Sequence, residues 1–161
     1  AYAFRLGPVP ETFCTAKVNS CGTSPAVSAA GTPSATSPSG FVVSSDRVRG
    51  PKSNGAKTTG ILIYTDTGRR IPAVPFGLGG FLCMNSPVRR TGTLFANGGT
   101  TNQCDATFDA DMNAFAHGLL GGNPQAYLLV PGTLVTLQIW GRDTFAHGNY
   151  LSGALEYSIC P

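Results

Sequence analysis

Charged residues are scarce in this chain of 161 residues, at 12% of the sequence. Average globular domains carry about 25% charged residues. Exposed helical surfaces are built largely from Glu, Lys, Arg and Gln, so the shortage argues against a mainly helical fold. No apolar run is long enough to span a membrane as a helix. The sequence therefore predicts neither a helical bundle nor membrane insertion.

Several catalytic and ligand-binding signatures are also missing. There is no G-x-S-x-G nucleophile elbow, no glycine-rich phosphate loop before a helix and no C-x-x-C unit. Glu11 and Glu156 are the only glutamates, and no pair of acids stands out as a glycosidase pair. The net charge of +3 is too small to indicate nucleic-acid binding. We expect a protein that is not an enzyme and does not bind nucleic acid.

The arginines include two doublets, Arg69-Arg70 and Arg89-Arg90, each near a proline and a glycine. We interpret them as solvated turn residues. Binding to acidic glycans or anionic surfaces is the less favoured alternative, because no basic stripe interleaved with aromatic residues is present.

Glycine and proline are plentiful, with 21 and 12 copies. Between them lie short segments rich in β-branched and aromatic residues, which is typical of strands joined by turns. The predicted strands are residues 26–28, 40–48, 60–66, 80–84, 93–97, 106–116, 126–130, 133–143 and 154–160. We predict an all-β, antiparallel sandwich of two sheets with about eight or nine strands and little helix. Residues 1–13 form an N-terminal arm with at most one edge strand, and residues 14–161 form a single domain.

Five cysteines favour an oxidising compartment, and we expect the protein to be secreted or held at the extracellular surface. The histidines lie at no zinc-finger spacing from them, so disulfides are preferred to zinc. The disulfide candidates are Cys14, Cys21, Cys83, Cys104 and Cys160. The odd count leaves at least one cysteine over, and sequence alone does not choose the pairing. A chain that starts at Ala1 without methionine fits either a removed leader or a trimmed sequence.

The tetrapeptide Phe-Ala-His-Gly occurs twice and contains the only two histidines, His117 and His147. Alternation along residues 106–116 predicts a strand with one wet face. That face, extended by one step, carries Asp109, Asp111, Asn113 and His117. These four are weak candidates for a metal site, calcium included, but the EF-hand pattern breaks after its first half. A solvated strand face is the preferred interpretation, so we expect no cofactor, and a metal-dependent hydrolase is a remote alternative.

Trp140 is the only tryptophan and lies in the predicted strand 133–143. Alternation places Gln138, Trp140 and Arg142 on a mostly polar face, where the indole could stack on a sugar ring. Tyrosines such as Tyr64, Tyr127 and Tyr150 could contribute to the same platform. The alternative, which we favour, is that Trp140 covers a sheet edge or packs beneath a loop.

Five stretches of the chain are similar to small exported β-rich domains of secreted and surface proteins from myxobacteria, planctomycetes and related bacteria. They read FCTAKVNSCG, GFLCMNSPVRRTG, DMNAF, LQIWGRD and LSGALEYSICP, within residues 12–161. The resemblance implies a bridge between Cys14 and Cys83. It implies a second bridge between two of the remaining three cysteines, Cys21, Cys104 and Cys160. It also implies a recurrent Q-x-W-x-R-D pattern, from Gln138 to Asp143, with a scaffold role, and it implies no catalytic residues.

These observations together predict a non-enzymatic, extracellular structural or adhesive protein. Its partners would be further copies of itself, in a surface layer or filament, or surface glycans. In the first case the arm, residues 1–13, could add a strand to a neighbour's open sheet edge. The alternative function is a carbohydrate-binding accessory module.

Overall fold

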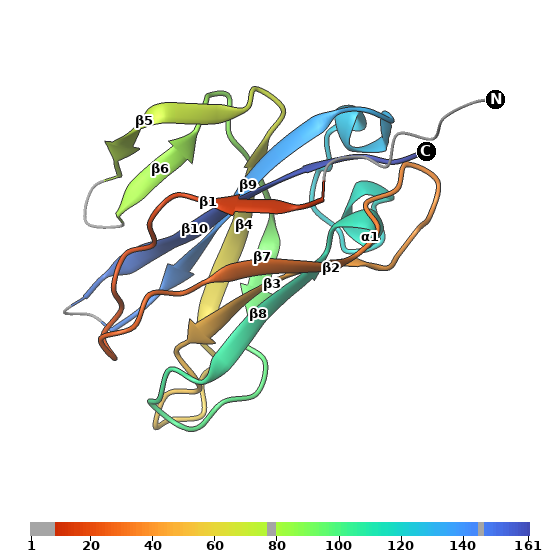
Figure 1. Cartoon of the computed structure of the whole chain (residues 1–161). Coiled ribbons are helices and arrows are strands. Elements are labelled where there is room, and N and C mark those ends of the chain that lie inside the picture. Colours follow the sequence, from red (N-terminus) through yellow and green to blue (C-terminus); the bar gives the residue numbers. More distant parts are fainter. Residues whose placement is uncertain (1–8, 77–79, 145–146) are drawn as a thin grey trace.

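Ten β-strands dominate the part of the chain that the computed structural model describes, residues 9–76, 80–144 and 147–161 (Figure 1). The strands are β1 (Glu11–Phe13), β2 (Val27–Gly31), β3 (Phe41–Val48), β4 (Thr59–Thr65), β5 (Arg69–Pro75), β6 (Phe81–Met84), β7 (Arg89–Phe95), β8 (Ala106–Asp111), β9 (Leu134–Arg142) and β10 (Asn149–Ser158). The short helices are α1 (Met112–Ala116) and η2 (Ala126–Leu129), a 3-10 turn. The predicted all-β, antiparallel, disulfide-bonded fold with little helix is confirmed.

The strands form three sheets. The largest has the order β1-β10-β9-β4-β7, a second has the order β2-β3-β8, and β5 pairs with β6 in a hairpin. The main core lies between the two larger sheets and includes Phe41, Phe108, Leu62, Leu137 and Tyr157. The hairpin packs on the opposite face of the five-stranded sheet, which we call the outer face (Figure 1).

Strand β9 is buried on both faces because it lies between the main core and the hairpin. Its residues Val135 to Ile139 are all buried. A strand covered on both sides needs no wet face. The prediction of a mostly polar, open face that includes Gln138 is therefore wrong. On this face β9 is exposed only at its two ends, at Leu134 and at Trp140 and Arg142.

The predicted strand 106–116 is wrong in its second half. Strand β8 ends at Asp111, whose side chain accepts a hydrogen bond from the backbone N–H of Ala114 at 3.0 Å and so caps helix α1. All five residues of α1 are buried, so the segment has no wet face. The predicted strand 126–130 is also wrong, because η2 occupies its place.

The arginine doublets do not lie in turns, as the sequence predicted, but begin strands β5 and β7. The Arg69 guanidinium reaches from the hairpin to the five-stranded sheet. Its Nε donates to Glu156 Oε1 at 2.8 Å, and its Cζ lies 4.3 Å from the centre of the Phe13 ring. It also hydrogen-bonds Glu11 and holds the pKa of that exposed carboxyl below its ordinary value. Arg69 thus ties one end of the hairpin to β1 and β10.

The two disulfides join Cys14 to Cys83 and Cys21 to Cys104, with Cα–Cα distances of 6.3 and 6.1 Å. The first pairing agrees with the resemblance described above. Cys160 is the free thiol among the five described cysteines. Two disulfides are compatible with an oxidising extracellular environment.

Two further predictions concern the membrane and the arm. In the described residues, neither helix is long and apolar enough to cross a membrane. Most of the predicted arm, residues 1–8, lies outside the described residues. Its last three residues form β1 and pair with β10 of the same chain, so they are already part of a sheet.

Candidate functional site

The hairpin covers only part of the outer face. Beneath it lies a second, smaller cluster of buried side chains, formed by Ile63, Met84 and Leu151. Trp140 packs against the border of this cluster and is half-buried. Beyond Trp140, towards the β9–β10 loop, the outer face opens into a groove.

Gln138 holds the hairpin in place. Its side chain is fully buried and makes three hydrogen bonds. Oε1 accepts from the Cys83 N–H at 2.9 Å, while Nε2 donates to the carbonyls of Phe81 at 3.1 Å and Ser152 at 3.0 Å. Gln138 therefore cannot contact a glycan, and its predicted place in a sugar platform is wrong.

Trp140 stands in a row of residues that crosses the sheet. It pairs with Leu151 of β10 on one side and with Ile61 of β4 on the other, and Ile61 pairs in turn with Thr93 of β7. Directly paired residues of neighbouring strands point to the same face. The indole therefore has apolar side chains on both flanks and an exposed threonine beyond them.

The next row lies about 7 Å further along the strands and is polar on β9 and β10. Asn149 of β10 pairs there with Arg142 of β9. Arg90, on β7, pairs with Ile63 and reaches the groove from its other end. The groove has a volume of about 540 Å³. Its lining consists of Thr59, Gly60, Ile61, Ile63, Phe76, Arg90, Thr93, Trp140, Arg142 and Asn149.

The charges of the groove are all positive. Its lining contains Arg90 and Arg142 and no acidic residue. Neither arginine makes an ion pair within the described part of the chain, whereas Arg47, Arg49 and Arg69 do. An apolar floor with an indole and two unpaired guanidinium groups can stack on a ring and bind oxygen atoms around it.

The two histidines do not meet. His117 follows helix α1, which packs beside Tyr64 near the start of β9, whereas His147 lies in the loop after the end of β9 (Figure 1). The backbone carbonyl of His147 accepts a hydrogen bond from Lys17 Nζ at 2.7 Å. The prediction that His117 ends a half-wet strand is wrong, because it caps a helix and its Nε2 is buried.

The weak metal candidates are engaged in structural hydrogen bonds. Asp109 accepts from the hydroxyls of Ser44 and Thr107, each at 2.6 Å. Asp111 caps α1 and also accepts from the Gly40 N–H. Asn113 is buried in α1 and holds the backbone around residues 32–39. Within the described residues, no three His, Cys, Asp or Glu side chains are placed to hold a metal ion.

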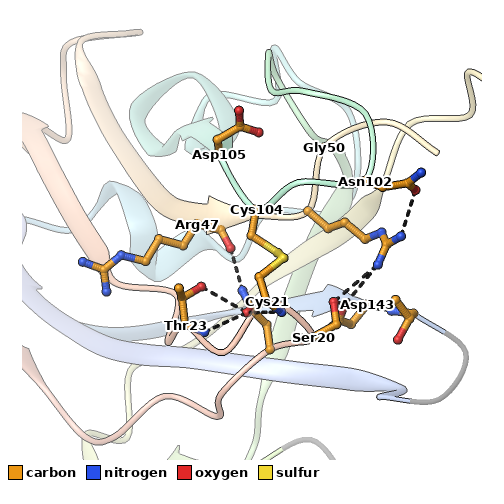
Figure 2. Close-up of a disulfide and its surroundings, with 12 residues drawn as sticks. Ser20, Cys21, Thr23, Arg47, Gly50, Asn102, Cys104, Asp105 and Asp143 are labelled. Atoms are coloured by element: carbon orange, nitrogen blue, oxygen red, sulfur yellow. Dashed lines mark hydrogen bonds and ion pairs between the residues drawn. A yellow bond between two sulfur atoms is a disulfide. The ribbon is translucent and has the colours of Figure 1, made fainter. Parts of the chain in front are cut away.

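Asp143 immediately follows β9 and fixes the N-terminal segment to the end of the groove strand. Its carboxylate accepts hydrogen bonds from the backbone N–H and the hydroxyl of Ser20, and the Arg49 guanidinium lies 4.0 Å away. Figure 2 shows this cluster beside the Cys21–Cys104 disulfide. The cluster ties the end of β9, where Arg142 lies, to the N-terminal segment around Ser20 and to Arg49.

The residues of the Q-x-W-x-R-D pattern thus have two different roles. Gln138 and Asp143 hydrogen-bond the scaffold, while Trp140 and Arg142 line the groove. The sequence placed Trp140 and Arg142 on one face but missed Arg90, Phe76 and Asn149. Of these three residues only Arg90 was noticed in the sequence, as part of the Arg89-Arg90 doublet. The doublet begins β7, whereas the sequence predicted this strand to begin at residue 93.

The three tyrosines of the predicted platform do not line the groove. Tyr64 and Tyr150 are fully buried in the main core, and this burial raises the pKa of both phenols. Tyr127 packs edge-on against Tyr64, with ring centres 6.1 Å apart. Their predicted role in a sugar platform is therefore wrong.

Comparison with known proteins identified no relative of this chain. No family model, curated protein or solved structure matches this chain.

Proposed function

We propose that this chain is a non-enzymatic extracellular adhesion module that binds surface glycans in the groove over Trp140. The observation that carries the proposal is the partly buried indole on an apolar floor, flanked by Arg90, Arg142 and Asn149. Sugar rings present apolar C–H faces that stack on aromatic rings and hydroxyl groups that hydrogen-bond to such neighbours. A preformed concave site of this kind suits an oligosaccharide segment.

Two further features support the proposal: one favours an extracellular location, and the other favours binding over catalysis. The disulfides and the low charge fit an exported protein. Both glutamates are ion-paired with Arg69, and the aspartates nearest the groove strand serve as structural acceptors. Glycoside hydrolysis requires a pair of carboxyl groups on either side of the bond that is cleaved, and these acids form no such pair around the groove.

Replacing Trp140 by alanine is expected to weaken glycan binding about tenfold or more, because the stacking surface is lost. A glycan array followed by calorimetry on the best ligand measures the change. Phe81→Ala is the matched control, because Phe81 is an exposed aromatic residue of the hairpin outside the groove lining. Thermal unfolding of each variant separates lost binding from lost structure. Absence of binding to any glycan, or equal binding by wild type and Trp140→Ala, would contradict the proposal.

Self-assembly is the second candidate function. Strand β7 is an edge strand of the five-stranded sheet and carries Phe95, whose side chain is 59% exposed. Free strand edges accept further strands from other chains. Light scattering over a range of protein concentrations is expected to show oligomers that Phe95→Lys reduces. A monomer mass at all concentrations would count against self-assembly.

A further inference from the structure

We infer that the groove selects a saccharide that carries carboxylate groups, that is, a uronic-acid polysaccharide. This inference rests on the proposed glycan-binding function and names its ligand class. It follows from the charges around Trp140 and from how the chain uses its acidic residues.

The positive charge of the groove is uncompensated. Arg90 and Arg142 are exposed and line the groove without an acidic neighbour in its lining. Most acidic residues of the chain are engaged elsewhere. Glu11 and Glu156 bind Arg69, and hydrogen bonds hold Asp46, Asp105, Asp109, Asp111 and Asp143. The remaining acid, Asp66, follows β4 at the end opposite to Thr59, which lines the groove. A neutral sugar would leave both guanidinium groups without an anionic partner.

The spacing of the two charges favours carboxylates over dense sulfation. Arg90 lies on β7 and Arg142 on β9, with β4 between them. Between the two arginines the floor is apolar, formed by Trp140, Ile61 and Ile63. A uronate has one charge per ring and keeps a C–H face free to stack on this floor. A densely sulfated chain would place sulfates over apolar side chains.

Arginine chemistry supports the same ligand. The guanidinium fork donates two parallel hydrogen bonds to a carboxylate, and such charge-assisted bonds are stronger than those to neutral hydroxyls. Both arginines are free to turn toward a ligand, because they make no ion pair within the described residues. The interaction is exposed to solvent, so added salt should weaken it.

Calorimetry with three probes tests the inference in a buffer without divalent cations. The probes are an oligogalacturonate, the same oligosaccharide with its carboxylates methyl-esterified, and a heparin fragment. We expect the oligogalacturonate to bind at least about tenfold more tightly than its ester, and more weakly as salt is raised. Arg90→Gln and Arg142→Gln should each lose about tenfold in affinity for the acid and little for the ester. Arg89→Gln is the matched control, since it removes the same charge one residue away and lies outside the groove lining.

The outcomes separate the inference from the proposed function. Equal binding of acid and ester, or arginine variants that bind the acid like wild type, would overturn the uronate inference and leave glycan binding in place. Tighter binding of heparin would also overturn it. Failure of all three probes, together with a blank glycan array, would remove the proposed function itself.

Discussion

Replacing Cys21 and Cys104 together by alanine is expected to lower the free energy of unfolding by about 2–5 kcal/mol. The bridge joins residues 83 apart in the sequence and further restricts an unfolded chain that the Cys14–Cys83 bridge already crosslinks. The segment it anchors buries little apolar surface of its own, since Val18 is 54% exposed. Hydrogen bonds from Asn19 and Ser20 hold it instead. Urea unfolding at equilibrium measures the loss.

The free thiol supplies the control for this experiment. Cys160→Ser changes a cysteine that forms no bridge in the structure and is expected to leave the unfolding free energy within about 0.5 kcal/mol of wild type. An unchanged unfolding free energy in the double alanine variant would contradict the anchoring role of the bridge. A loss in Cys160→Ser as large as in the double variant would contradict it as well.

Replacing Gln138 by leucine is expected to cost about 2–3 kcal/mol, because two buried backbone groups and one partly buried group would lose their partner. These groups are the Cys83 N–H and the carbonyls of Phe81 and Ser152. Leucine fills a similar volume, so the loss would come from unsatisfied hydrogen bonds rather than from a cavity. Urea unfolding gives the stability change, and amide hydrogen exchange at Cys83 reports directly on the broken contact.

Gln125→Leu is the matched control for this change. Gln125 is half-buried, and its side chain makes one long hydrogen bond, 3.4 Å, to the Asn123 carbonyl. Its replacement should alter stability by no more than about 0.5 kcal/mol. If Gln138→Leu keeps both wild-type stability and wild-type protection at Cys83, then Gln138 does not hold the hairpin. Loosening the hairpin should also weaken glycan binding, because Phe76, which directly follows β5, lines the groove.

Local sequence patterns identified most of the strands correctly. Segments such as 40–48 and 60–66 are rich in β-branched and aromatic residues and lie between glycine, proline and asparagine, and both are strands in the structure. The pattern failed where a local hydrogen bond decided the outcome. Asp111 caps a helix in the middle of an alternating run, and alternation alone cannot distinguish this cap from a wet strand position.

The candidate site was only partly visible in the sequence. Alternation placed Trp140 and Arg142 on one face of a strand, which is correct, and placed Gln138 beside them as an exposed residue, which is wrong. The error has a tertiary cause, because strand geometry fixes which side a residue faces but not what covers that side. The hairpin that covers Gln138 begins at an arginine doublet that was taken for a turn.

The sequence by itself determined the all-β class, because the shortage of helix-forming charged residues and the frequent turn residues leave little else. It also determined that disulfides would form and that one cysteine would remain. Tertiary structure alone decided that the histidines lie apart and that the hairpin covers part of the outer face (Figure 1). It alone brought Arg90 of β7 to the same groove as Trp140 of β9, since contacts between distant strands depend on sheet order and register.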